Sequence, residues 1–451
     1  MSFFDKAHTV ADPQYNRWLI PPAALAVHLC IGQAYALSVF NLPMSRLIGI
    51  DAPAAGDWGL TTTVWIFNIA FFFLGVSAAI FGKWVEQAGP RKAMFVAALC
   101  FGGGFLVSAL GVYLHTIWLV YLGYGALGGI GLGIGYISPV STLMKWFPDR
   151  PGMATGLAIM GFGGGAMIGS PLAVGLMDFY ASPASVGVWE TMLSMGIIYF
   201  CMMMFGVWNI RVPAPGWQPA RWQAAAPAAP PAAPSAGMDA NTAIRTRPFW
   251  MVWLVLCTNV TAGIGILAQA SPMIQEMFTG QITAAAAAGF VGLLSLFNLL
   301  GRFFWSSLSD KLGRKWTYTV FFVLGATLYA AIPSLGGLSS PVLFVLAAIV
   351  IVSMYGGGFA TVPAYLRDLF GMKQVGAIHG RLLTAWSTAA ILGPSLVTYL
   401  REYQISAGVA PADAYSTTMY IMAGILFVGL TANLLVNKSF ELALKPQTEN
   451  A

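Results

Sequence analysis

The stretches FGKWVEQAGPRK at residues 81–92 and WSSLSDKLGRK at residues 305–315 decide the fold, because the second repeats the pattern of the first some 224 residues later. In both, glycine stands three positions after an acidic residue and a basic residue follows. The matched residues are Glu86, Gly89 and Arg91 in the first stretch and Asp310, Gly313 and Arg314 in the second. A motif that recurs at this distance predicts a chain built from two similar halves.

The composition indicates a membrane protein. Hydrophobic residues make up 58% of the 451 residues and charged residues only 8%, whereas soluble globular proteins carry about 25% charged residues. A chain this apolar cannot cover its surface with polar groups, so the bilayer must be its solvent. The net charge of +6 does not indicate nucleic-acid binding, because the sequence has no basic patch with interleaved aromatic residues.

Twelve apolar runs are long enough to cross a bilayer as helices, which takes about 20 residues each. Six of them precede a Pro/Ala-rich stretch and six follow it. The first set lies near 18–42, 60–82, 92–114, 117–141, 152–176 and 186–210, and the second near 249–274, 284–308, 316–336, 342–366, 381–400 and 415–437. We therefore predict an all-α membrane protein of twelve transmembrane helices in two six-helix halves.

The basic residues test this count, because Lys and Arg favour cytoplasmic segments. With the N-terminus inside, all of the 22 Lys and Arg residues except Arg46, Arg302 and Arg401 fall in cytoplasmic segments. A wrong helix count would scramble this partition. The pattern predicts a multi-pass membrane protein with both termini in the cytoplasm. We also expect a monomer in a bacterial cytoplasmic (inner) membrane.

The stretch 213–248 differs in composition from the rest of the chain. It contains the low-complexity run AAAPAAPPAAPSAG at residues 224–237, which is typical of a linker. We predict an N-terminal six-helix bundle over 1–212, a cytoplasmic linker over 213–248 and a C-terminal six-helix bundle over 249–451.

The repeated loop itself has a candidate function in gating. A carboxylate at a helix end can bind the terminus of a neighbouring helix and nearby basic residues. Such a bond, present in one conformation and broken in another, would bias a transport equilibrium. We therefore predict that the six matched residues of the two loops act in gating. The alternative is that these basic loops only set the topology.

Glycines are concentrated in the predicted spans 117–141 and 152–176. Among them, Gly161, Gly165 and Gly169 lie on one face of a helix. Glycine allows helix backbones to approach closely in a membrane and lowers the cost of bending. Helix packing and a transport-related bend both account for this series.

Arg302 is the one basic residue placed inside a predicted span and away from its ends, about two turns from the cytoplasmic end of 284–308. A charge there costs several kcal/mol unless it is paired or hydrated, at about +2.5 kcal/mol or more on insertion scales. No Asp or Glu falls deep in a predicted span to pair with it, and Asn298 lies four residues earlier on the same face. A guanidinium with a neighbouring amide favours a carboxylate ligand; the alternative is that Arg302 reaches the cytoplasmic surface.

Other polar and aromatic residues of the spans are candidates for closing a small cavity around an anion. His28 lies in the first span, where it serves either packing or contact with a substrate or proton. The remaining candidates, all aromatic, are Tyr35, Tyr136, Tyr355 and Trp386.

The sequence does not suggest an enzyme. Its four cysteines form no CxxC pair, and its four histidines are widely scattered, so neither a nucleophile–base pair nor a metal cluster is indicated. We expect no cofactor and no metal.

Four stretches resemble a known family: NRWL (16–19), WFPDRPG (146–152), RTRPFWMVWL (245–254) and NLLGRFFWSSLSDKLGRK (298–315). Together they resemble the oxalate/formate antiporter family of the major facilitator superfamily, over nearly the whole chain. That resemblance implies parallel six-helix repeats and transport by alternating access between the halves.

The resemblance also implies roles for individual residues. An arginine that grips the substrate carboxylate corresponds to Arg302, and an aromatic residue lining the site corresponds to Tyr136. At the position where the family's oxalate transporter has a lysine, this chain has Trp386. Since two cations suit a dianion and one suits a monoanion, this departure favours monocarboxylates such as formate, lactate or pyruvate.

Three alternatives stay open. One is oxalate/formate antiport. Another is proton-coupled monocarboxylate symport, although related transporters with an aspartate four residues before the arginine differ from this chain, which has Asn298. A protein that senses a carboxylate without moving it is the third. Anion exchange is the simplest expectation, because closing the site around a bare, dehydrated Arg302 is costly.

Overall fold

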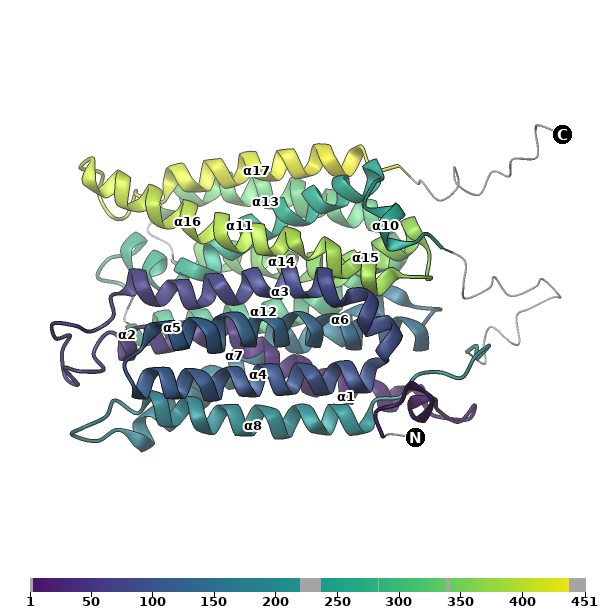
Figure 1. The fold of residues 1–451 in the computed structure, drawn as a ribbon. Coiled ribbons are helices and arrows are strands. Elements are labelled where there is room, and N and C mark those ends of the chain that lie inside the picture. Colours follow the sequence, from purple (N-terminus) through teal and green to yellow (C-terminus); the bar gives the residue numbers. More distant parts are fainter. Residues whose placement is uncertain (1–2, 220–236, 283, 338–340, 438–451) are drawn as a thin grey trace. The chain divides into compact units, whose positions relative to one another are not determined.

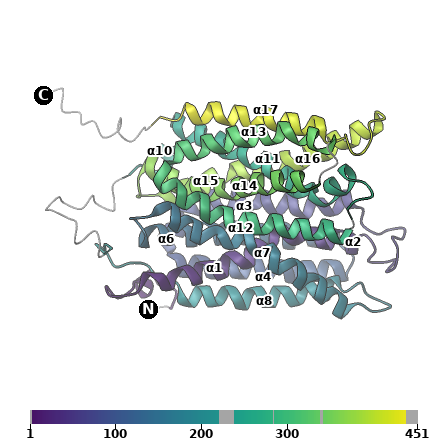
Figure 2. The same ribbon diagram turned by 180° about the vertical axis from the view of Figure 1, so that it is seen from behind.

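The computed structural model describes residues 3–219, 237–282, 284–337 and 341–437. Those residues fold into helices and connecting turns (Figures 1 and 2). Part of the predicted linker, residues 220–236, lies outside the described residues. By their internal contacts the residues divide into two units. The first unit comprises Met1–Asp149, Leu157–Ala229 and His379–Ser387, and the second comprises Arg150–Gly156, Pro230–Ile378 and Thr388–Ala451.

The N-terminal helices follow the predicted spans closely. Short 3₁₀ turns, η1 (Lys6–Thr9) and η2 (Arg17–Leu19), precede the first span. The helices are α1 (Ile20–Ile31), the 3₁₀ segment η3 (Gly32–Phe40), α2 (Asn41–Met44), α3 (Leu60–Ala88), α4 (Pro90–Tyr113), α5 (Ile117–Val120), the π-helical segment η4 (Tyr121–Gly128), α6 (Gly129–Trp146), α7 (Pro151–Tyr180) and α8 (Val188–Asn209). Within the first unit, α4 packs against α6 and α8, and α3 packs against α6 (Figure 1).

The C-terminal helices repeat this arrangement. They are α10 (Ala240–Ala243), α11 (Arg247–Met277), α12 (Ala284–Leu312), α13 (Arg314–Gly337), α14 (Pro341–Phe370), α15 (Val375–Leu382), α16 (Thr384–Ser406) and α17 (Ser416–Leu434). Within the second unit, α12 packs against α14, and α13 packs against α17, as Figure 2 also shows. The all-α prediction is confirmed for the residues that the structure describes.

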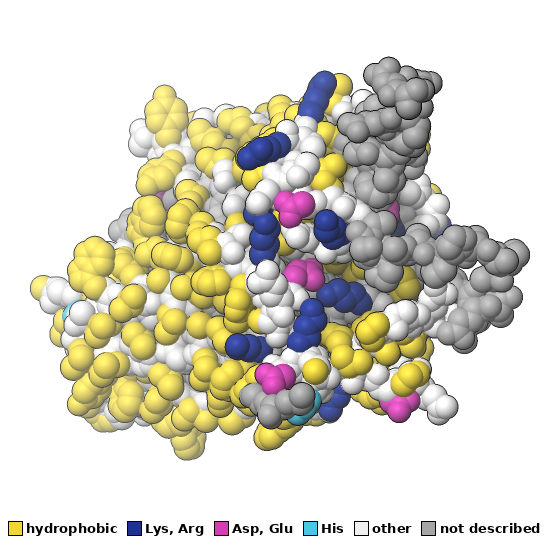
Figure 3. All heavy atoms as spheres, turned by 45° about the vertical axis from the view of Figure 1, so that its right-hand side comes forward, with side chains coloured by type: hydrophobic (Ala, Val, Ile, Leu, Met, Phe, Trp, Pro, Cys, Tyr) yellow, Lys and Arg dark blue, Asp and Glu magenta, His cyan; other side chains and the backbone are white. Residues whose placement is uncertain are grey.

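Eleven helices in the described part of the chain are long and apolar enough to cross a membrane. The remaining predicted span, 381–400, falls on α15 and α16, which are separated at Leu383. Thr384, Ser387 and Thr388 make this segment less apolar than the others. In Figure 3, Lys and Arg side chains gather in one part of the face shown and hydrophobic side chains cover the adjoining surface, a separation that is typical of membrane proteins.

A glycine contact joins α1 and its 3₁₀ extension to α7 within the first unit. A Cβ atom added at Gly165 would meet the backbone of Gly32 and Leu29, and one at Gly161 would meet Leu25 and His28. Gly169 faces Gln33 in the same way. The glycine face predicted from sequence therefore packs against a neighbouring helix, as glycines do in membranes.

We expect Gly165→Leu to destabilise the protein by roughly 1–3 kcal/mol, because the added side chain would force the two backbones apart. Gly175→Leu is the matched control, since Gly175 lies on the same helix with no atom within 4 Å of an added Cβ. The measurement is the midpoint of thermal unfolding in detergent. Equal shifts for the two variants would contradict the close contact.

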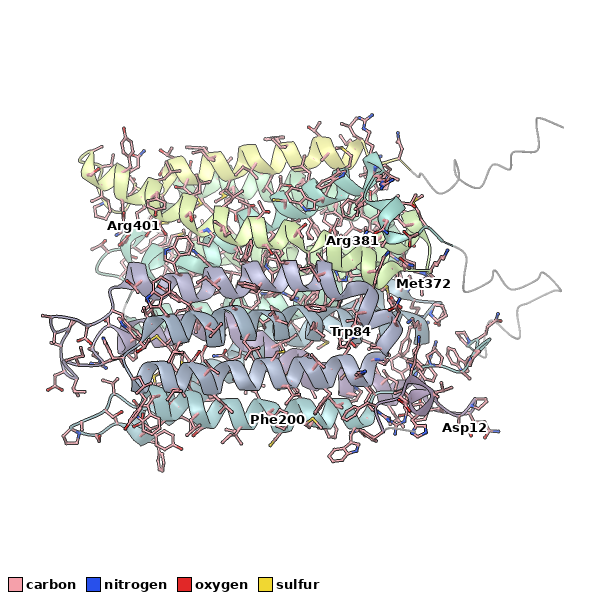
Figure 4. All side chains as sticks on the ribbon, viewed as in Figure 1. Asp12, Trp84, Phe200, Met372, Arg381 and Arg401 are labelled. Carbon is pink, nitrogen blue, oxygen red and sulfur yellow. The ribbon has the colours of Figure 1, made fainter. Side chains whose placement is uncertain are left out.

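A charged cluster ties three helices of the second unit together at one end. Arg401 Nε lies 2.9 Å from Glu276 Oε2, Arg401 Nη2 donates to Oε1, and the Tyr415 hydroxyl donates to Oε2 at 2.7 Å. Figure 4 places Arg401 near the C-terminal end of α16. Burial alone would raise the pKa of Glu276, but the hydrogen bonds from Arg401 and Tyr415 outweigh it and lower the pKa below its ordinary value of 4.5.

We expect Glu276→Gln to destabilise the second unit at neutral pH by about 1 kcal/mol. The effect is modest because 27% of the Arg401 side chain and 23% of the Glu276 side chain are exposed. A lowered folded pKa means that the stabilisation is complete above pH 4.5 and is lost as the pH falls through the folded value. Unfolding midpoints of wild type and variant should thus converge on acidification; a constant difference would contradict the ionised pair.

Candidate functional site

The C-terminal end of α12 holds the start of α7 through Asp310. Its two carboxylate oxygens accept hydrogen bonds from the backbone N–H groups of Gly152 and Met153, at 2.9 and 3.0 Å. Arg314 Nη2 donates to Asp310 at 2.6 Å, and Arg314 Nε donates to Asp368 at 3.1 Å. A carboxylate at a helix N-terminus is stabilised both by unpaired N–H groups and by the helix dipole.

The corresponding loop between α3 and α4 has the same backbone shape but different partners. Gly89 has φ +85° and Gly313 has φ +84°, a region that glycine adopts without strain. The Glu86 carboxylate is bonded by Lys145 at 3.1 Å, and Arg91 donates to the Phe3 carbonyl at 3.0 Å with its guanidinium 4.4 Å from the Phe3 ring. The acidic residues of the two repeats thus bind different kinds of groups: a side-chain ammonium for Glu86 and a helix terminus for Asp310.

Arg302 lies on α12 and is fully buried. Its Nε donates to Asn298 Oδ1 at 3.1 Å, as the four-residue spacing predicts, and its guanidinium carbon is 5.3 Å from the Phe359 ring on α14. Asn298 is neutral, so this hydrogen bond orients the guanidinium without neutralising its charge. Gly356 permits the close approach, since a Cβ there would meet Asn298 and Arg302. Full burial does not fit the alternative in which Arg302 reaches the surface.

Five aromatic side chains of the first unit form what we call the aromatic cluster: Tyr35, Phe71, Tyr136, Phe162 and Trp386. Trp386 is the hub, with its ring centroid 5.4 Å from Phe71, 5.4 Å from Tyr136 and 5.2 Å from Phe162. Tyr35 adjoins Phe71 and Phe162. These edge-on contacts are favourable for aromatic rings and hold the cluster in one geometry.

Two histidines adjoin the aromatic cluster through Tyr136. His28 stacks on its ring at 5.3 Å and lies 3.1 Å from its carbonyl oxygen, so that His28 Nε2 is the donor. The ring of His379 lies 5.8 Å from that of Tyr136. Both histidines are fully buried.

The residues predicted to bind substrate therefore belong to two groups. His28, Tyr35, Tyr136 and Trp386 come together in the first unit; Asn298, Arg302 and Tyr355 are in the second. Tyr355 is 5.2 Å from Phe359 and lines a small buried cavity with Asn259 and Tyr329.

Sequence reasoning missed Phe71, Phe162, Phe359 and His379, which contact the predicted residues. Phe162 stands within the glycine series of α7, a signal that could have singled it out. It also missed an ion pair between two of the stretches that carry the family resemblance. Arg17 Nη1 and Nη2 donate hydrogen bonds to the two carboxylate oxygens of Asp149, at 2.7 and 3.1 Å.

Long apolar helices with charged residues between them define an integral membrane protein. The chain belongs to the major facilitator superfamily, whose family model matches residues 23–394 and 282–450. Members of this superfamily are transporters rather than enzymes.

Curated relatives match most of the chain at low identity. It is 24% identical to the MFS-type transporter YhjX of Escherichia coli (strain K12), over 85% of this chain and 88% of that one. It is 26% identical to the oxalate:formate antiporter of Oxalobacter formigenes, over 84% of each chain. Identity to the apicoplast pyruvate carrier 1 of Toxoplasma gondii is 23%, over 91% of this chain and 87% of that one.

Solved structures support the fold. A bacterial homologue of the iron transporter ferroportin superposes with a TM-score of 0.65 at 12% identity, covering 92% of this chain and 98% of that one.

Proposed function

We propose that this protein moves small monocarboxylate anions across a bacterial cytoplasmic membrane by alternating access, and that it works by anion exchange. The observation that carries the proposal is Arg302, a fully buried guanidinium held by a neutral amide. Its planar fork matches the two oxygens of a carboxylate. Relatives named for oxalate:formate antiport and pyruvate transport support the carboxylate class.

Trp386 supports a monoanion over a dianion. It occupies the position where the family's oxalate transporter is expected to have a lysine, and its ring packs against those of Phe71, Tyr136 and Phe162. With one cation, the binding energy of a second carboxylate would not offset its desolvation. Oxalate:formate antiport is the second candidate, favoured by the relative of that name.

Exchange would follow from the cost of burying the Arg302 guanidinium without its anion. An empty carrier must close around a dehydrated guanidinium, which costs several kcal/mol by analogy with other buried ions, roughly 3–5 kcal/mol. A bound anion removes that cost, so the loaded carrier would return faster than the empty one. Proton symport would need a titrating group, for which His28 is the candidate.

Counterflow in proteoliposomes tests the proposal. Vesicles loaded with unlabelled formate, lactate, pyruvate or oxalate are offered the same labelled anion. We expect uptake of the monocarboxylates and little uptake of oxalate. Strong oxalate uptake would favour the second candidate, and anion binding without flux would identify a sensor. The absence of any response to all four anions would overturn the carboxylate class.

A further inference from the structure

His379 is held rigidly against the first unit. It opens the segment His379–Ser387, which belongs to that unit. A Cβ added to the next residue, Gly380, would meet the backbone of Ala78 on α3, so the two backbones touch. At the other end of the segment, the Ser387 hydroxyl lies 3.0 Å from the Phe71 carbonyl and 3.1 Å from that of Phe72. The imidazole therefore has a fixed place in the unit.

The His379 side chain is fully buried, yet neither ring nitrogen has a hydrogen-bond partner among the residues that the structure describes. A neutral imidazole has one N–H donor and one acceptor nitrogen. Burying each without a partner costs about 1–3 kcal/mol. A buried polar group left in this state needs an explanation, such as a bound water or a ligand.

His28 provides the contrast. It is equally buried and also packs against Tyr136, but its Nε2 donates a hydrogen bond to the Tyr136 carbonyl. Thus His28 donates its hydrogen bond to a backbone carbonyl, whereas the ring nitrogens of His379 can still bond a further group. The His379 ring lies 5.8 Å from that of Tyr136, which in turn contacts Trp386.

We propose that His379 donates a hydrogen bond to a carboxylate oxygen of the transported anion and thereby helps to select monocarboxylates. This inference rests on the proposed function. A neutral N–H donor adds binding energy and direction without a second charge. The imidazole and not Trp386 then supplies the polar contact of the segment 379–387.

The test uses full-length protein with three substitutions. His379→Phe keeps a ring of similar size but removes both nitrogens, and aromatic neighbours favour its folding. His379→Gln restores an N–H donor. His8→Ala is the control, because His8 is exposed on η1. For each, the half-saturating formate concentration is measured twice, from counterflow and from the rise of the thermal unfolding midpoint with formate.

We expect half-saturation to rise about tenfold or more in His379→Phe, since a hydrogen bond to a charged group is lost. His379→Gln should recover part of the affinity, and His8→Ala should match wild type. Without formate, His379→Phe should unfold no earlier than wild type, because the removed nitrogens had no protein partner. If His379 had only a structural role, both results would be reversed. His379→Phe would then unfold at a lower temperature than wild type, and its half-saturating formate concentration would be unchanged.

Two failures are distinguishable. If wild type responds to formate, Arg302→Ala abolishes the response and His379→Phe leaves half-saturation unchanged, only the role of His379 is overturned. If wild type neither binds nor transports any of the monocarboxylates, the proposed function falls and the role of His379 falls with it.

Discussion

Arg302→Ala is expected to reduce monocarboxylate counterflow at least a hundredfold. The guanidinium is the proposed carboxylate partner, and charge-assisted hydrogen bonds are worth about 1.5–3 kcal/mol each, so losing a bidentate pair costs two of them. Arg302→Lys should keep some uptake with weaker binding, because an ammonium supplies the charge without the planar fork. The measurement is initial uptake rate against anion concentration.

Two controls separate binding from folding. Lys311→Ala removes an exposed cation from the same helix and should leave uptake near wild type. The thermal unfolding midpoint of Arg302→Ala without anion should not fall far, because removal of a buried charge offsets the lost packing. Full transport with unchanged half-saturation in Arg302→Lys would exclude a bidentate contact, and full transport in Arg302→Ala would remove Arg302 from the site.

Asp310→Asn is expected to lower the maximal uptake rate by tenfold or more with little change in half-saturation. The Asp310 carboxylate holds the first turn of α7 through two N–H groups and is paired with Arg314. Asparagine keeps the shape but loses the charge that interacts with the helix dipole and with the guanidinium. The conformational equilibrium should shift while the anion contacts stay intact.

Glu86→Gln is the matched control in the other repeat. Its ion pair with Lys145 is one third exposed on the lysine side, so its loss should cost little. We therefore expect a clearly smaller effect on uptake than for Asp310→Asn. Equal losses in the two variants, or a change confined to half-saturation, would contradict a gating role specific to Asp310.

The helices were predictable because spanning a bilayer imposes length and apolarity on the sequence itself. All twelve predicted runs fall on helices, and the Arg302–Asn298 contact follows from the four-residue periodicity of a single helix. The glycine face of α7 was predictable for the same reason. At 381–400, where hydroxyl residues dilute the apolar run, the helix begins earlier, at Val375, and breaks at Leu383.

Contacts between distant segments were not predictable. Whether Asp310 binds a helix start and Glu86 a lysine depends on which loop lies beside which helix end, and the two loops have nearly the same sequence pattern. His379 was not singled out, because the sequence does not reveal whether the ring nitrogens of a histidine are buried without a hydrogen-bond partner. Arg17 and Asp149 likewise meet only once the chain has folded.

The ion pair of Arg17 with Asp149 has a practical consequence. It joins the segment before α1 to the loop after α6. Residues 9–11 of the same segment pair with Val212 through backbone hydrogen bonds. These ties give the N-terminal segment a fixed geometry on the first unit. An antibody fragment raised against residues 3–19 would thus recognise a conformational epitope and serve as a rigid fiducial for particle alignment in electron cryomicroscopy.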